Sequence, residues 1–125
     1  MANPNIVAVT TINGVTTYLT PANTTANTLL SNAAASGLVY KINQIVAANV
    51  DGTNAVNTTV AINSLAAGAG TNYPIVSTVS VPANASLIVT DKTTAIYLME
   101  NQSIVVTSGT SSKIAYTISY ESIAS

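Results

Sequence analysis

The chain has 125 residues and a formal net charge of −1, and only 6% of its residues are charged, whereas about 25% is usual. It contains no His or Cys, which removes the common catalytic bases and nucleophiles and practically excludes zinc. Three lysines and no arginine cannot form a basic patch for nucleic acid or for an anionic membrane. We therefore expect a protein that associates through an amide- and hydroxyl-rich surface, not an enzyme, with no cofactor and no small-molecule substrate.

Short apolar-alternating runs lie between clusters of Asn, Gly, Pro and Ser, a pattern typical of antiparallel sandwiches and barrels. The first two predicted strands, residues 6–12 and 15–19, flank Asn13-Gly14, which is the best hairpin signal in the chain. Residues 21–37 are rich in Ala, Asn, Thr and Ser and predict a loose segment with one short strand at 28–31.

A long strand is predicted at residues 38–50, followed by a turn at Asp51-Gly52. One face of this strand should carry Leu38, Tyr40, Ile42, Gln44, Val46, Ala48 and Val50. A strand that begins near Val56 follows, then a loop at 65–72 and a strand at 73–81, in which Pro74 favours an edge or the strand start.

The turn at residues 82–84 introduces three short predicted strands at 86–90, 95–99 and 103–107. Residues 114–121 alternate without a break and predict the last strand. The sequence thus predicts an all-β fold, an antiparallel β-sandwich of about 8–9 strands. We expect residues 1–12 to form an N-terminal arm with the first strand, and residues 13–125 to form a single β-sandwich domain.

Membrane insertion and classical secretion are both unexpected. No apolar run approaches the ~20 residues that a spanning helix needs. The opening MANPNIVAVTT has no positively charged start and no apolar signal core.

Three segments carry a family resemblance: LVYKINQIVAANVDGTNAVNTTVAI, VSVPANASLIVTDKTTAIYLMENQSIVVTSG and IAYTISYESI. Their pattern resembles the jelly-roll-type β-sandwich common among virion structural proteins of tailed phages, including marine phages and cyanophages. The opening MANPNIVAVTTING is similar to the short N-terminal arm of such proteins. The resemblance covers about two-thirds of the chain and the arm, and it carries over no catalytic residues.

The resemblance implies a capsid decoration (cement) protein that binds the major capsid protein and copies of itself, as a homo-oligomer, on the capsid surface of virions assembled in the host cytoplasm. The arm could add an edge strand to a neighbouring subunit. Tyr97 and Met99 lie opposite Ile96 and Leu98, so that strand is apolar on both faces and is either covered by another sheet or docked on a partner. The predicted contact residues are Asn3, Pro4, Asn5, Ile6, Val7, Val9, Tyr97 and Met99.

Two alternatives remain open. The chain could be a tail, collar, baseplate or fibre component, which copy number would separate from a decoration protein. It could also be a carbohydrate-binding or adhesion module for the host surface, although such modules usually expose aromatic platforms and the chain has no Trp or Phe.

The four carboxylates do not form a recognisable catalytic or metal-binding motif. Asp51 and Asp91 both lie in turn-like contexts, so each is expected to bond the backbone of its own turn. The DGTN segment at 51–54 resembles the start of a calcium loop but lacks the later acidic positions and the bidentate glutamate. We therefore expect no metal site.

Overall fold

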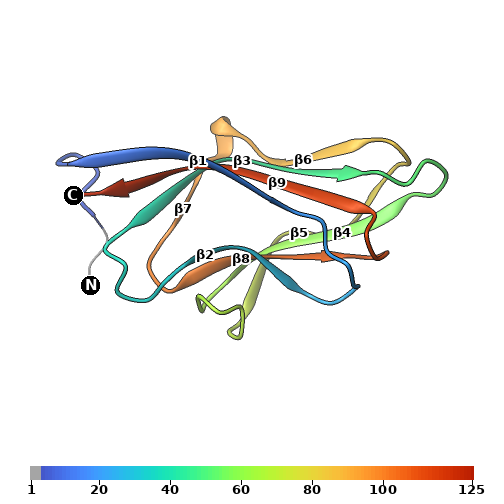
Figure 1. The fold of residues 1–125 in the computed structure, drawn as a ribbon, viewed down its shortest axis with the longest axis horizontal. Coiled ribbons are helices and arrows are strands. Elements are labelled where there is room, and N and C mark those ends of the chain that lie inside the picture. The colour runs from blue at the N-terminus through green and yellow to red at the C-terminus, as the bar shows by residue number, and fades with distance from the viewer. Residues whose placement is uncertain (1–3) are drawn as a thin grey trace.

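The computed structural model describes residues 4–125, which form nine strands and a short 3-10 turn, η1 (Lys92–Thr94) (Figure 1). The strands are β1 (Thr11–Leu19), β2 (Asn27–Asn32), β3 (Val39–Asn49), β4 (Val56–Asn63), β5 (Asn72–Val81), β6 (Ser86–Thr90), β7 (Ile96–Leu98), β8 (Gln102–Ser108) and β9 (Ile114–Ala124). The predicted all-β class is confirmed. Residues 4–125 include no helix long and apolar enough to cross a membrane.

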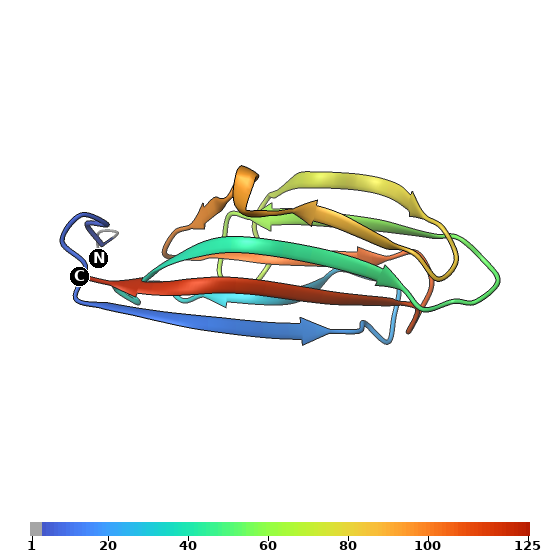
Figure 2. The same cartoon turned by 90° about the horizontal axis from the view of Figure 1, so that it is seen from above.

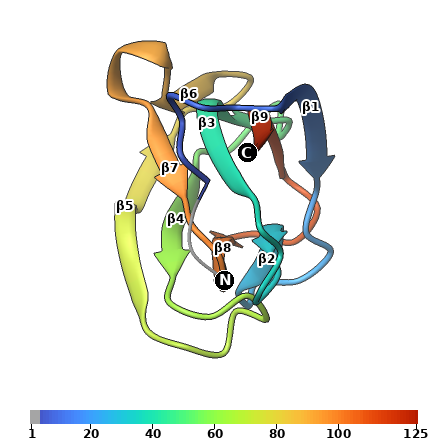
Figure 3. The same ribbon diagram turned by 90° about the vertical axis from the view of Figure 1, so that its left-hand side faces the viewer.

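The strands form two antiparallel sheets that pack face to face, as the end-on view of Figure 3 shows. One sheet has the order β1-β9-β3-β6, with β7 also paired to β3, and the other has the order β2-β8-β4-β5. The chain passes repeatedly from one sheet to the other, which gives the two interleaved Greek keys of a jelly roll. The predicted jelly-roll-like β-sandwich is therefore confirmed.

The core fills the space between the two sheets. Its largest fully buried side chains are Tyr116, Ile42, Ile45, Leu98, Ile104, Ile114, Ile118, Val60, Val81, Val106, Asn32 and Asn63. Ten of these twelve are apolar or aromatic, as hydrophobic burial requires. Asn32 and Asn63 are unexpected in such a core.

The predicted hairpin at Asn13-Gly14 is wrong. Strand β1 runs unbroken through both residues and pairs with β9 from Thr11 to Leu19. Neither residue adopts the positive φ that a tight hairpin turn requires. Pairing of the whole of β1 with β9 therefore overrides the local turn propensity.

The predicted strand at residues 6–12 is also wrong over most of its length. Asn5 turns the chain instead, because its side-chain Oδ1 accepts from Val7 N at 2.9 Å and its backbone oxygen accepts from Ala8 N at 3.1 Å. Thr10 N then donates to Ala124 O at 2.9 Å, and β1 begins at the next residue.

The predicted face of β3 is correct only at its start. Against β9, the register shifts between Ile42 and Gln44, so Asn43 forms a β-bulge. A bulge moves the following side chains to the opposite face of the sheet. The buried set consequently continues with Ile45 and Ala47, whereas Gln44 is exposed.

Candidate functional site

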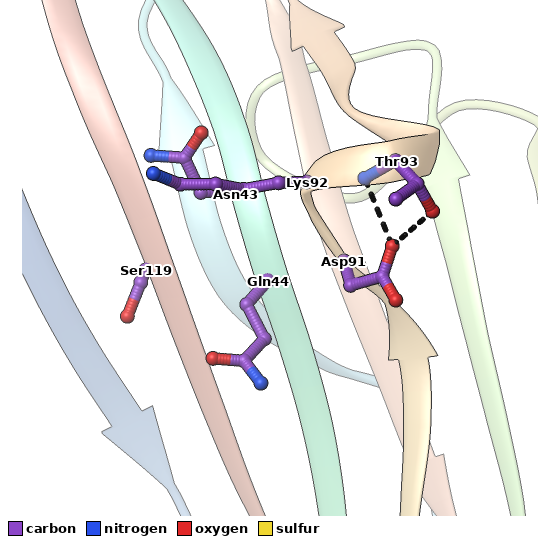
Figure 4. A pocket seen from close by; sticks show the side chains of 6 residues that line it. All are labelled: Asn43, Gln44, Asp91, Lys92, Thr93 and Ser119. Carbon is purple, nitrogen blue, oxygen red and sulfur yellow. Dashed lines mark hydrogen bonds between the residues drawn. The ribbon is translucent and has the colours of Figure 1, made fainter.

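A polar hollow of about 500 Å³ lies where η1 meets the outer face of β3 and β9 (Figure 4). Its lining residues are Asn43, Gln44, Asp91, Lys92, Thr93 and Ser119. The bulge at Asn43 brings both Asn43 and Gln44 to this hollow. Lys92 extends from η1 across the front of β3 in Figure 4.

Asp91 is the N-cap of η1. Its Oδ1 accepts from the Thr93 hydroxyl at 2.5 Å and from Thr93 N at 2.9 Å (Figure 4). These bonds hold the pKa of the Asp91 carboxyl below its ordinary value, and the bond from the Thr93 hydroxyl has the largest effect. Asp51 likewise accepts from Thr53 N and Asn54 N, which lower its pKa. The prediction that both carboxylates bond their own turns is confirmed.

Apart from Asn43 Oδ1, the remaining polar groups of the hollow make hydrogen bonds or face solvent. Asn43 Nδ2 donates to Glu121 Oε1 at 3.2 Å, whereas Asn43 Oδ1 is buried without a partner in the structure. The Ser119 hydroxyl bonds that of Thr16 at 3.0 Å. These lining residues offer hydrogen bonds to a polar group but include no paired nucleophile and base. Within residues 4–125, no three His, Cys, Asp or Glu side chains gather closely enough to hold a metal ion.

The predicted contact residues are partly brought together by the fold. A second hollow, of about 240 Å³, is lined by Pro4, Ile6, Val39, Tyr97 and Met99, and we call it the apolar hollow. The N-terminal segment thus lies beside β7, although the two are about ninety residues apart in sequence. Of its lining residues, Ile6 is 52% exposed, Tyr97 44% and Met99 42%.

The other predicted contact residues lie outside this hollow. Val7 is 91% exposed. Asn5 turns the segment, and Val9 is half-buried just before β1. Asn3 lies outside the described residues. The role of these residues in contacts stays a prediction.

Three strands end on a buried asparagine that closes a loop, a feature that sequence reasoning missed. Asn32 ends β2 and donates to Leu38 O at 2.9 Å and to Leu98 O at 3.1 Å. Asn49 ends β3 and donates to Val81 O at 2.9 Å, while its Oδ1 accepts from Asp51 N. Asn63 closes the loop after β4 in the same way. The signal in the sequence was an Asn at the end of an apolar run and next to a loop or turn.

Folding stability should be nearly constant between about pH 5 and 9 and should fall on both sides, because the chain has no His or Cys side chain to titrate there. In the folded protein, the pKa values of Asp51 and Asp91 lie below their ordinary value of 3.8. The ionised carboxylates therefore stabilise the fold above pH 3.8, and this stabilisation is lost as the pH falls towards the folded-state pKa values. Burial raises the pKa of Tyr116 above its ordinary value of 10.0. Its contribution to folding stability is therefore present below pH 10.0 and is lost as the pH rises through the folded-state pKa.

Urea unfolding across this pH range measures the profile. Asp91→Asn retains a capping oxygen but removes the charge, so it should flatten the acid slope and lower stability at neutral pH by the part that the ionised Asp91 contributes. A steep change between about pH 5 and 9 would contradict this account.

Taken together, the strand order and the packing place the chain in the class of jelly-roll β-sandwiches. No protein-family model and no curated protein matches the chain. Among solved structures, it is similar to a chain from the work "Bacillus endospore appendages form a novel family of disulfide-linked pili". The identity is 18% and the TM-score 0.49, over 92% of this chain and 88% of that chain.

Proposed function

We propose that this chain is a structural protein of a tailed-phage virion, a decoration protein that binds the outer capsid surface and stabilises the shell without catalysis. The observation that carries the proposal is the apolar hollow, an exposed apolar surface on a protein with very few charges. The resemblance of residues 79–108 to jelly-roll virion proteins supports the choice of the capsid as partner.

The apolar hollow supplies a driving force for docking. Ile6, Tyr97 and Met99 each leave roughly half of their surface in water. Burying apolar surface contributes about 25 cal/mol per Å², and aromatic and methionine side chains are enriched in interfaces. With only 6% charged residues, little charge has to be desolvated when the surface docks. A protein that binds only the assembled shell stabilises that shell by linkage.

The N-terminal segment can add to this contact. Within the described residues, Asn5 makes its hydrogen bonds with Val7 and Ala8 inside the segment itself. Few bonds would therefore break if residues 4–9 moved onto a neighbouring protein. There the segment would extend along an exposed strand edge by β-augmentation.

The proposal is tested by co-sedimentation of the purified chain with phage capsids. Combining Tyr97→Ser with Met99→Ser should lower the amount bound by at least about tenfold, because both side chains line the apolar hollow. The matched control is Tyr73→Ser, which changes a 61% exposed tyrosine on β5 and should bind like the parent. Deleting residues 2 to 10 should abolish binding and leave the β-sheet circular dichroism signal intact.

The number of copies bound per particle also separates a capsid protein from a tail component. A copy number that follows the capsid lattice supports the proposal, whereas copies that follow the rotational symmetry of the tail would assign the chain to the tail. Equal capsid binding by the parent and the Tyr97/Met99 double variant would exclude the apolar hollow as the contact. No binding to capsids at all would overturn the proposal.

A further inference from the structure

Strand β1 forms an open edge of the five-stranded sheet. It pairs with β9 along all nine of its residues, and no described strand pairs with its other side. Figure 2 shows β1 as the outermost strand of its sheet. Residues 11–16 are exposed, including Ile12 at 55% and Val15 at 37%, and Tyr18 is 79% exposed. Such an edge is a template for pairing with another strand.

The other edges of the sandwich carry features that block strand addition. Strand β5 contains Pro74, which has no backbone N–H to donate, and Thr78 with a φ of 50°. Its pairing with β4 also shifts register twice. Strand β2 has only six residues and a register shift, and β6 and β7 have five and three residues. Strand β1 has no proline, no charged residue and no register shift.

Two copies of β1 are complementary when they pair antiparallel with Val15 of one copy opposite Val15 of the other. In that antiparallel register, Tyr18 lies opposite Ile12 of the other strand, and Thr16 lies opposite Gly14. Ile12 and Tyr18 are six residues apart and therefore share one face of the strand. Opposed aromatic and β-branched side chains stabilise a strand pair. The strand has no charged residue that would meet its own copy with like charge.

We propose that two copies of this chain dimerise through β1, antiparallel about a two-fold axis at Val15, so that their five-stranded sheets become continuous. Each Tyr18 then covers the partner's Ile12, and both side chains leave water. The contact is isologous and closes at two copies. This inference goes beyond the proposed function, because it needs no capsid and holds for the isolated chain.

Sedimentation equilibrium tests the dimer on the full chain from about micromolar to about millimolar concentration. Combining Ile12→Lys with Tyr18→Lys places lysines opposite each other twice and should weaken the dimer by at least about tenfold. Combining Ile12→Lys with Tyr18→Glu places opposite charges in the same register and should restore most of the affinity. Such rescue occurs only if positions 12 and 18 face each other across the axis.

The matched control combines Ile88→Lys on β6 with Tyr73→Lys on β5, which adds the same charge at positions that are 58% and 61% exposed. This control should dimerise like the parent. Because all four positions are exposed, circular dichroism should show folded protein throughout. A parent chain that stays monomeric, one that forms larger polymers, or a lysine–glutamate variant no tighter than the lysine–lysine variant would overturn the proposal.

Discussion

Replacing Asn63 with Asp should lower the free energy of unfolding by about 3–5 kcal/mol at neutral pH, although the two side chains have nearly the same shape. Asn63 is fully buried at the end of β4. Its Nδ2 lies 3.2 Å from Gly68 O, 3.2 Å from Gly70 O and 2.6 Å from Asn72 Oδ1. Its Oδ1 accepts from Leu65 N and Gly70 N. One amide group therefore organises the whole β4–β5 loop.

A carboxylate at position 63 would turn this donor into an acceptor. An ionised oxygen would face three acceptor oxygens in a buried site, so the introduced carboxyl should have a raised pKa. When the pKa of a group is higher in the folded than in the unfolded state, the protein is most stable below the unfolded-state pKa. This stability is lost as the pH rises through the folded-state pKa. The variant should therefore regain part of its lost stability when the pH is lowered from about 7 to about 4.5.

Urea unfolding of the parent and the variant at both pH values measures this effect. Asn57→Asp is the control, because Asn57 is exposed on the same strand and its replacement should change stability by no more than about 0.5 kcal/mol. Similar losses for both variants, or a loss at position 63 that does not shrink in acid, would show that the Asn63 amide does not hold the loop.

The sequence predicted strands best where apolar alternation runs without a break. Residues 86–90 were predicted as a strand and form β6 with the same ends, and the alternation at 114–121 lies within β9. Prediction failed where long-range pairing decides the outcome. Asn13-Gly14 carries strong turn chemistry, yet β9 holds it in a straight strand. The bulge at Asn43 has no local mark in the sequence, so the face of β3 could not be followed past it.

The candidate surfaces depend even more on the topology. Apolar residues on both faces of the strand around Tyr97 left open whether another sheet covers it or a partner docks on it, and in the structure Tyr97 is 44% exposed. That Pro4 and Ile6 would lie beside it follows only from how the chain crosses the sheet. The polar hollow likewise combines residues from β3, η1 and β9, which no sequence spacing connects. The buried asparagines were missed because Asn is usually assigned to exposed turns.

Tyr116 connects the two sheets through the core, so its loss should be among the most damaging single changes. It is the largest fully buried side chain and lies on β9. Its hydroxyl bonds the Thr58 hydroxyl on β4 and donates to Thr107 O on β8 at 2.9 Å. Tyr116→Ala should cost about 3–5 kcal/mol by opening a cavity. Tyr116→Phe keeps the ring and should cost about 1–3 kcal/mol, because the buried Thr58 hydroxyl and the partly buried Thr107 O each lose a partner.

A double-mutant cycle with Thr58→Val separates the hydroxyl pair from the packing of the ring. The valine has the shape of threonine but no hydroxyl, so Tyr116→Phe should cost less in the Thr58→Val background than in the parent, by about 0.5–3 kcal/mol. Tyr73→Phe, at a tyrosine that is 61% exposed, should leave stability unchanged. Chemical unfolding of the four cycle members gives the coupling energy. Strictly additive costs would mean that packing of the ring alone joins the sheets, because a buried hydroxyl pair that contributes to stability must appear as coupling.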